Sequence, residues 1–111
     1  MDESAYHRVV AATFRRIEDR LADVDPDVLE VSRSGDVLTL TFAGGLRCIL
    51  NTQRPVRQLW LAVASLGRAY HFDYDAASGT WRDDRGEGIE LLGHLQRLLH
   101  DVAGVDIALH R

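Results

Sequence analysis

The densest set of charged side chains in the sequence is an acidic stretch, residues 18–30, which reads EDRLADVDPDVLE. Six carboxylates stand there against the single Arg20, so the stretch has a local net charge of −5. They are Glu18, Asp19, Asp23, Asp25, Asp27 and Glu30, called the acidic ridge below. Such a cluster attracts cations or an arginine-rich protein surface. The alternative is a solvated helix end whose acids only aid solubility, which is the commoner case for an arbitrary sequence.

A second candidate site centres on Trp60 in the stretch QLWLAV, residues 58–63. Because side chains alternate along a strand, the aliphatic residues of this stretch share one face, and Trp60 shares the other with Gln58. If the aliphatic face is covered, Trp60 faces solvent. There it either anchors a protein partner or lies flat against the neighbouring strands. The pattern leaves these two interpretations even.

The same alternation sorts the neighbouring strands. It predicts outward-facing side chains at Arg47, Asn51, His71 and Asp73. It predicts inward-facing side chains at Leu46, Cys48, Leu50, Tyr70, Phe72 and Tyr74. Cys48 is therefore expected to be a small apolar core residue rather than a reactive thiol. His7 follows Glu3 by one helical turn and can join a metal site, although a solvated surface role is commoner. His94, His100 and His110 have no spacing that suggests a site.

Helical periodicity predicts the elements at the two ends of the chain. Apolar residues recur at spacings of three and four from Ser4 to about Ala22 and again over residues 91–102, which predicts two amphipathic helices. Asp2, Glu3 and Ser4 can cap the first helix. Pro26 stops the first pattern and Gly104 the second.

Between the helices the apolar period changes to two, which is typical of strands. Six short runs fit: residues 28–32, 37–42, 46–51, 58–63, 69–74 and 80–83. Four of the five gaps between them contain glycine, and the gap at residues 52–57 contains Pro55 instead. Residues 106–109 suffice only for a short strand or a tail packed on the helix. The order predicts one α+β domain over residues 1–111, a two-layer sandwich with both helices on one face of an antiparallel sheet.

Composition narrows the function. The single cysteine excludes an internal disulfide, and the net charge of −4 disfavours nucleic acid as the main partner. No leader peptide or membrane-spanning run is recognisable, so we expect no membrane partner and either a cytosolic protein of a prokaryote or an already processed organellar one. Of these two locations we predict the bacterial cytoplasm. Neither a nucleophile elbow nor a phosphate-binding loop occurs, which favours a binding protein over an enzyme.

Several motifs follow one another in a characteristic order. The pattern N-x-Q-x-P-x-x-Q-x-W-L spans residues 51–61, and YHFD at 70–73 precedes Trp81. Upstream lie residues 4–8 with His7, then Glu18 with Arg20 and Leu21, then VLTLTF at 37–42. Together with the predicted order of helix, strands and helix, this combination resembles the bacterial frataxin family over nearly the whole chain.

The resemblance implies an iron-binding protein of iron-sulfur cluster assembly that acts as an iron donor, as a regulator of the cysteine desulfurase, or as both. It implies weak binding of Fe2+ and Fe3+ at the acidic ridge, with Asp2, Glu3 and His7 flanking, and desulfurase contact through the same ridge. It also implies that the scaffold protein contacts a sheet surface made of Asn51, Gln53, Gln58 and Trp60, called the Trp60 surface below. A monomer is expected, and iron-dependent oligomers and weak oxidation of bound iron stay open.

The chain departs from the family pattern on its first helix. Arg15 and Arg16 lie within it, and Ala22 stands where relatives often carry another carboxylate. Arg15 can pair with Asp19 at i,i+4 and Arg16 can neutralise the surroundings of Glu18, so we expect a lower iron stoichiometry. The remaining alternative is a metal-independent acidic adaptor or chaperone that binds a partner protein through the Trp60 surface.

Overall fold

The fold is built around one antiparallel sheet whose strands follow one another in chain order, β1-β2-β3-β4-β5-β6. The computed structural model describes residues 1–109, apart from the side chain of Ser65. His110 and Arg111, and with them one of the histidines considered above, lie outside the described residues. The elements are α1 (Glu3–Leu21), β1 (Leu29–Ser34), β2 (Val37–Phe42), β3 (Arg47–Gln53), β4 (Gln58–Val63), β5 (Arg68–Asp75), β6 (Thr80–Asp83) and α2 (Leu91–Ala103). Two short 3-10 turns, η1 (Arg54–Val56) and η2 (Ala64–Leu66), link β3 to β4 and β4 to β5.

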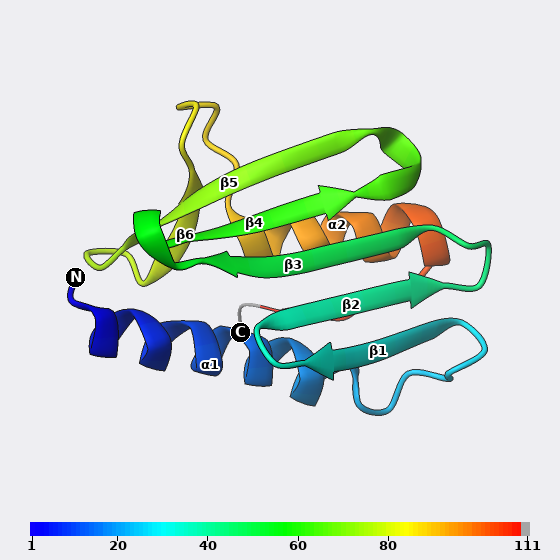
Figure 1. Cartoon of the computed structure of the whole chain (residues 1–111). Helices are drawn as coiled ribbons and strands as arrows, with labels where there is room; N and C mark the ends of the chain where they lie inside the picture. The colour runs from blue at the N-terminus through cyan, green and yellow to red at the C-terminus, as the bar shows by residue number, and fades with distance from the viewer. Residues whose placement is uncertain (110–111) are drawn as a thin grey trace.

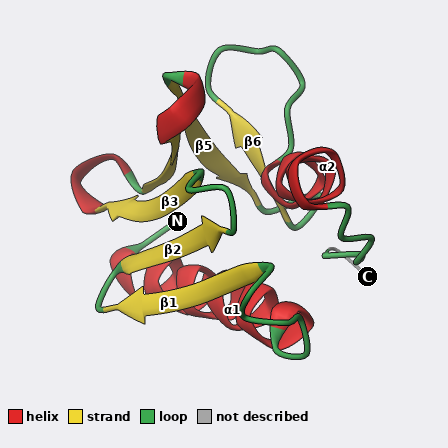
Figure 2. Ribbon diagram, turned by 90° about the vertical axis from the view of Figure 1, so that its right-hand side faces the viewer, coloured by secondary structure: helices red, strands yellow, loops and turns green. Residues whose placement is uncertain are grey.

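Both helices lie on the same face of the sheet, and the other face is open (Figures 1 and 2). The predicted two-layer α+β architecture is therefore confirmed. Connections between strands are tight: Ser34 pairs with Val37 across a two-residue turn in which Gly35 has a φ of 58°. A positive φ at this place favours glycine, because other residues rarely adopt it.

Helix α1 begins as the sequence predicts. The Asp2 side chain accepts a hydrogen bond from the Ala5 backbone N–H at 2.7 Å and so satisfies one free donor of the first turn. The buried side chains of α1 form one stripe: Tyr6, Val10, Thr13, Phe14, Ile17 and Leu21. The helix ends at Leu21, five residues before Pro26, and Ala22 is its cap. The proline therefore lies in the connecting loop and does not itself terminate the helix.

The core lies between the helices and the covered face of the sheet. Cys48, Leu50 and Phe72 point into it and are fully buried, as the alternation predicts. Burial raises the pKa of the Cys48 thiol to about 11, because the charged thiolate loses its solvation. Cys48 is therefore neutral near pH 7 and packs as a small apolar side chain.

The C-terminal segment packs as a tail, without a strand in the described residues. Leu109 is fully buried; its N–H donates to Gln96 Oε1 at 3.0 Å, and its carbonyl accepts from Arg16 Nε of α1. The tail thus ties α2 to α1. No helix in residues 1–109 has the length and hydrophobicity that crossing a membrane requires.

Candidate functional site: acidic ridge and Trp60 surface

The acidic ridge runs from the last turn of α1 to the first residues of β1. Glu18 and Asp19 belong to α1, Glu30 belongs to β1, and the other three carboxylates lie in the loop between them. All are exposed except Glu18, which is half-buried. The ridge therefore presents most of its oxygens to solvent.

Backbone hydrogen bonds hold the ridge loop in shape. Asp25 accepts twice at its carbonyl, from Val28 N at 2.8 Å and from Leu29 N at 3.1 Å. Its side chain accepts from the Asp27 N–H at 2.9 Å, an Asx turn. Asp25 thus has a structural role in the loop. Within residues 1–109, the carboxylates of Asp23 and Asp27 accept no hydrogen bond from protein, so both are available to a ligand.

The arginine that partly neutralises the ridge in the described residues is not one that helix spacing suggests. Glu18 pairs with Arg33 of β1 at 3.1 Å, and the Arg33 guanidinium lies over the Phe14 ring, 5.1 Å from its centroid. Arg16 turns away to the Leu109 carbonyl. Arg15 makes no ion pair with Asp19 in the described part of the chain. The partner of Glu18 comes from another element, which the periodicity of one helix cannot reveal.

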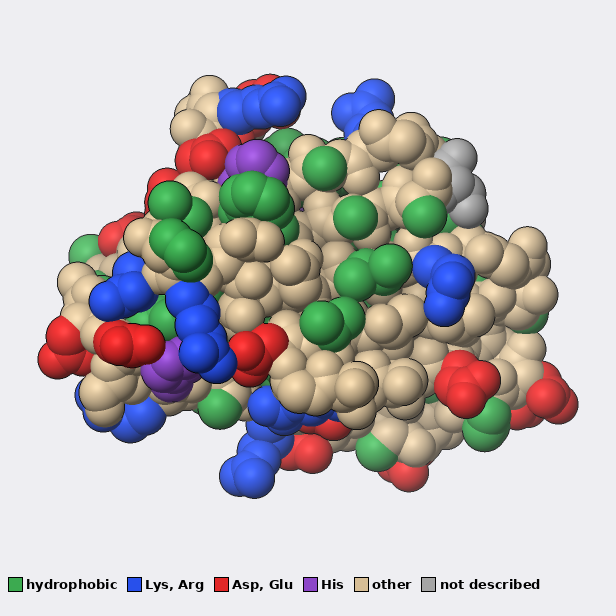
Figure 3. Space-filling model, in the orientation of Figure 1, with side chains coloured by type: hydrophobic (Ala, Val, Ile, Leu, Met, Phe, Trp, Pro, Cys, Tyr) green, Lys and Arg blue, Asp and Glu red, His purple; other side chains and the backbone are tan. Residues whose placement is uncertain are grey.

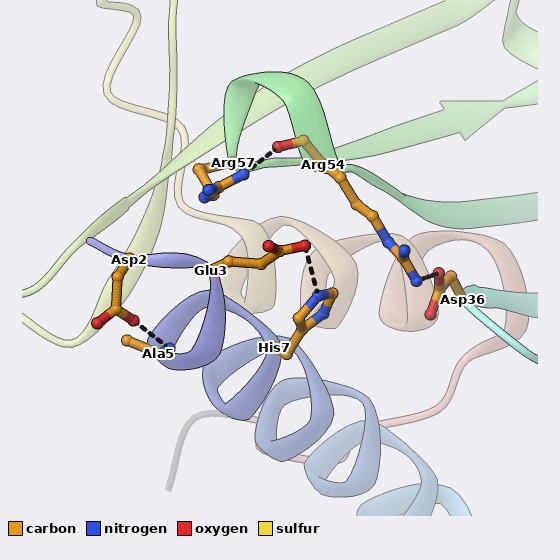
Figure 4. Close-up of polar contacts among 7 residues, drawn as sticks. All are labelled: Asp2, Glu3, Ala5, His7, Asp36, Arg54 and Arg57. Carbon is orange, nitrogen blue, oxygen red and sulfur yellow. Dashed lines mark hydrogen bonds and ion pairs between the residues drawn. The ribbon is translucent and has the colours of Figure 1, made fainter.

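Glu3 and His7 form a separate pair at the other end of α1. Their side chains point toward each other, with 3.6 Å between Glu3 Oε1 and His7 Nε2 (Figure 4). Glu18 lies eleven positions after His7 on the helix, which is a rise of about 16 Å. Glu3 and His7 therefore cannot share one ion with the ridge in this conformation, whereas the family resemblance implies that they flank it. Within residues 1–109, no three His, Cys, Asp or Glu side chains are grouped so as to hold a metal ion.

The polar residues around Glu3 and His7 belong to η1 and the first hairpin. Arg54 pairs with Asp36 at 3.0 Å, and Arg57 donates to the Arg54 carbonyl at 2.7 Å (Figure 4). The Arg57 guanidinium lies 5.9 Å from the centroid of the Tyr6 ring. This end of α1 thus faces arginines, which disfavours cation binding there.

The four residues of the Trp60 surface are brought together by strand register. Asn51 pairs with Trp60 and Gln53 with Gln58 across β3 and β4. On the other side of β4, Trp60 faces His71 of β5, and the two rings stack with centroids 4.0 Å apart and planes 14° apart. Trp60 is half-buried. The ring therefore makes the cross-strand contact of the second interpretation, and partner binding stays a prediction.

Gln58 makes the hydrogen bonds that hold this surface in place. Its Oε1 accepts from Trp60 Nε1 at 2.8 Å, and its Nε2 donates to Asp73 at 3.0 Å and to Asp84 at 3.2 Å. Asp84 also lies 3.6 Å from His71 Nδ1. Sequence reasoning missed Asp84, because it follows β6 in a loop and shares no alternation with β4. In Figure 3, which views this open face, the acidic and basic side chains gather mainly toward the borders.

The geometry defines a class: a two-layer α+β protein with an exposed acidic ridge at one end and an ordered aromatic and polar surface on its open sheet face. A family model described as a Frataxin-like domain matches residues 1–105. The chain belongs to the frataxin-like family.

Individual relatives agree in length and fold. The chain is 43% identical over 108 residues to the "Iron-sulfur cluster assembly protein CyaY" of Pseudomonas aeruginosa, covering 96% of this chain and 95% of the relative. A protein of the same name from Pseudomonas putida is 42% identical over 105 residues, 94% of this chain and 91% of the relative. A solved frataxin from Psychromonas ingrahamii superposes with a TM-score of 0.87 at 27% identity, over the whole of both chains.

Proposed function

We propose that this protein acts in iron-sulfur cluster assembly, carrying iron as cargo on the acidic ridge. The observation that carries the proposal is the full-length similarity to proteins named for that assembly, at 43% and 42% identity. The exposed carboxylates of the ridge add chemical support. Carboxylate oxygens are hard ligands that suit iron, and single exposed carboxylates without a His or Cys cage bind it weakly and exchangeably.

The finer role follows from the same surfaces. We propose that the ridge also contacts the cysteine desulfurase, so that the protein donates iron, regulates the desulfurase, or does both. The Trp60 surface would then receive the scaffold protein. The stacked Trp60 ring and its hydrogen bond from Nε1 to Gln58 hold that surface in one shape before binding, which lowers the entropy lost in a complex.

The ridge is tested with a pair of matched double variants. Asp23→Asn with Asp27→Asn removes two carboxylates that hold no backbone hydrogen bond in residues 1–109, and keeps Asp25 for the loop. Glu87→Gln with Asp101→Asn removes the same charge from exposed positions elsewhere. Anaerobic ferrous iron is titrated into each labelled protein while amide NMR signals are followed.

We expect iron-induced changes confined to residues 18–30 in the parent and in the Glu87 and Asp101 control, and a loss of most of them in the ridge variant. Binding to the desulfurase should weaken in the ridge variant alone. Equal iron responses in all three proteins, or none localised to the ridge, would refute iron carriage there.

A metal-independent adaptor is the second candidate function. The absence of a three-ligand group within residues 1–109 and the preorganised Trp60 surface favour it. Iron dependence separates the two, since both place the scaffold on the Trp60 surface: for the adaptor, scaffold binding is equal with and without iron, and Trp60→Ala removes it in both conditions. If scaffold binding survives Trp60→Ala in a folded protein, the adaptor candidate fails.

A further inference from the structure

The outward side of α1 carries a basic hollow directly upstream of the acidic ridge. An open groove of about 750 Å³ is lined there by Arg8, Ala11, Ala12, Arg15, Arg16, Asp19, Arg20 and Arg33. Five of the eight lining residues are arginines and one is an acid, so the groove is positive although the chain has a net charge of −4. We call it the arginine groove.

Helix geometry explains the hollow. Residues three and four apart are neighbours on a helix surface, so Ala11 and Ala12 lie between Arg8 on one side and Arg15 and Arg16 on the other. The short alanines form a floor and the long arginines form walls. Ala11 and Ala12 are both exposed in a helix whose buried stripe lies on its opposite side.

Three of the arginines are held in place by the protein itself. Arg8 donates to Ser4 Oγ at 3.0 Å, Arg16 donates to the Leu109 carbonyl, and Arg33 is fixed between Glu18 and the Phe14 ring. A guanidinium has five N–H donors, so each keeps donors for a ligand. Because their rotamers are already restricted, less side-chain entropy is lost when a ligand binds.

Arg15 and Arg20 differ from these three. Both are exposed, and within residues 1–109 neither makes a side-chain hydrogen bond or ion pair. The groove therefore combines anchored cations with two that are uncommitted. Two uncommitted arginines beside an apolar floor fit a ligand that has carboxylates and small apolar groups.

We propose that the arginine groove docks an acidic, extended polypeptide segment of a partner protein. From Arg8 to Arg20 the helix rises about 18 Å, which matches five or six residues of extended chain. Carboxylates of such a segment meet the arginines in bidentate pairs, and its small apolar residues cover Ala11 and Ala12. Charge complementarity selects the segment.

The groove suits a peptide better than a nucleic acid. Asp19 lies in the lining, and Glu18 stands beside it on the same helix turn. A phosphate backbone carries charge at every step and meets repulsion at these acids. A peptide can place a neutral residue there. This docking surface goes beyond iron carriage and is separate from the Trp60 surface.

The test uses a blocked peptide of alternating glutamate and alanine, about eight residues long, and a glutamine and alanine peptide as the neutral probe. Arg15→Gln with Arg20→Gln is the groove variant. Arg47→Gln with Arg85→Gln is its matched control, since both positions are exposed arginines outside the groove. Binding is followed by amide NMR shifts, and circular dichroism verifies that each variant is folded.

We expect the acidic peptide to shift amides of residues 8–20 and 33, and the neutral peptide to shift none. The groove variant should bind about tenfold more weakly, whereas the control should bind like the parent. Affinity should fall as salt rises from about 0.05 to 0.3 M. Equal weakening in both variants would overturn the proposal, because it would show a general charge effect.

Two further outcomes would also overturn it. Tighter binding of inorganic tripolyphosphate or of a short oligothymidylate would make the groove a phosphate site. Self-association of the parent that the groove variant abolishes would make a second copy of this chain the occupant. The iron titration follows the amides of residues 18–30 in the absence of any peptide, so it is independent of the peptide titration. If the groove does not bind the peptide, iron carriage by the ridge is unaffected. If the ridge does not bind iron, peptide docking in the groove is unaffected.

Discussion

The two tryptophans lie on opposite faces of one sheet, and they are held in different ways. Trp81 of β6 points into the covered face, is 2% exposed, and donates its Nε1–H to Thr13 Oγ1 of α1 at 2.9 Å. Trp60 of β4 is half-buried on the open face, where it stacks on His71 and donates to Gln58. The polar atom of each indole is satisfied. The covered ring connects two layers, whereas the open ring contacts only its own layer and leaves part of its surface exposed to solvent.

Trp81→Ala should give the largest effect. Truncation of a buried tryptophan leaves a cavity between α1 and the sheet, and we expect the free energy of unfolding to fall by about 3 to 5 kcal/mol. That is a large part of the stability of a domain of this size. Urea unfolding measures it, with Trp60→Ala as the matched truncation on the open face. Similar losses for the two variants would break the comparison.

The covered face is also the part of the molecule that sequence predicted best. Its residues obey two periods, every second position in Leu59 and Leu61 and every third or fourth in Tyr6, Val10 and Phe14. One buried face per element produces both patterns, so element type and inward direction follow directly. The ends of the elements follow less directly from these patterns. Alternation predicts β1 over residues 28–32, whereas the strand is observed at Leu29–Ser34, because hairpin pairing with β2 extends it to the turn.

The Thr13 hydroxyl is the polar link of the covered face. It donates to the Val9 carbonyl at 2.8 Å and accepts from Trp81. Thr13→Val keeps the side-chain volume and leaves the buried indole N–H unpaired, which should lower the free energy of unfolding by about 1 to 3 kcal/mol. Thr13→Ser keeps the hydroxyl, so it is the control for that bond. Hydrogen exchange of the Trp81 indole should quicken in Thr13→Val and stay slow in Thr13→Ser; equal exchange would deny the bond its role.

The open face and the acidic ridge were predicted only in part, and the reason is physical. Alternation correctly put Trp60 and His71 on one face. It could not predict the hydrogen bond between Gln58 and Asp84 or the ion pair between Glu18 and Arg33, because each joins elements that are remote in sequence. Charge density marks the ridge, but density alone does not say whether carboxylates converge. Here Glu3 and His7 lie at the other end of α1 from Glu18.

Trp60→Ala sharpens the comparison from the open side. The ring loses its stack on His71 and the bond to Gln58, and we expect a loss of about 1 kcal/mol in the free energy of unfolding. A double-mutant cycle with His71→Ala should give a coupling of about 0.5 to 1.5 kcal/mol, the usual worth of an aromatic pair. If the two losses are additive, the coupling free energy is zero and the stack on His71 does not stabilise the protein. The Trp60 ring could then leave the stack to bind a partner at no cost in stability.

The smallest expected effects on stability come from the titration of two histidines of α2. One of them has covered surroundings and the other has open surroundings, as the two tryptophans do. His94 is half-buried against Tyr70, with ring centroids 4.7 Å apart, and burial lowers its pKa from the ordinary 6.5, with Arg97 and Arg68 adding to the shift. His100 is exposed, and its hydrogen bond to Asp106 of the tail raises its pKa.

The two shifts have opposite signs. As pH falls below 6.5, the unfolded chain protonates His94 more readily than the folded protein does, so stability declines. The stabilisation from His100 is complete below 6.5 and is lost as pH rises through its raised folded pKa. NMR titration of the ring protons should therefore give a higher midpoint for His100 than for His94. Asp106→Asn should lower the His100 midpoint and leave His94 unchanged; a common midpoint in the parent would contradict both assignments, because it would mean that α2 does not separate covered from open surroundings.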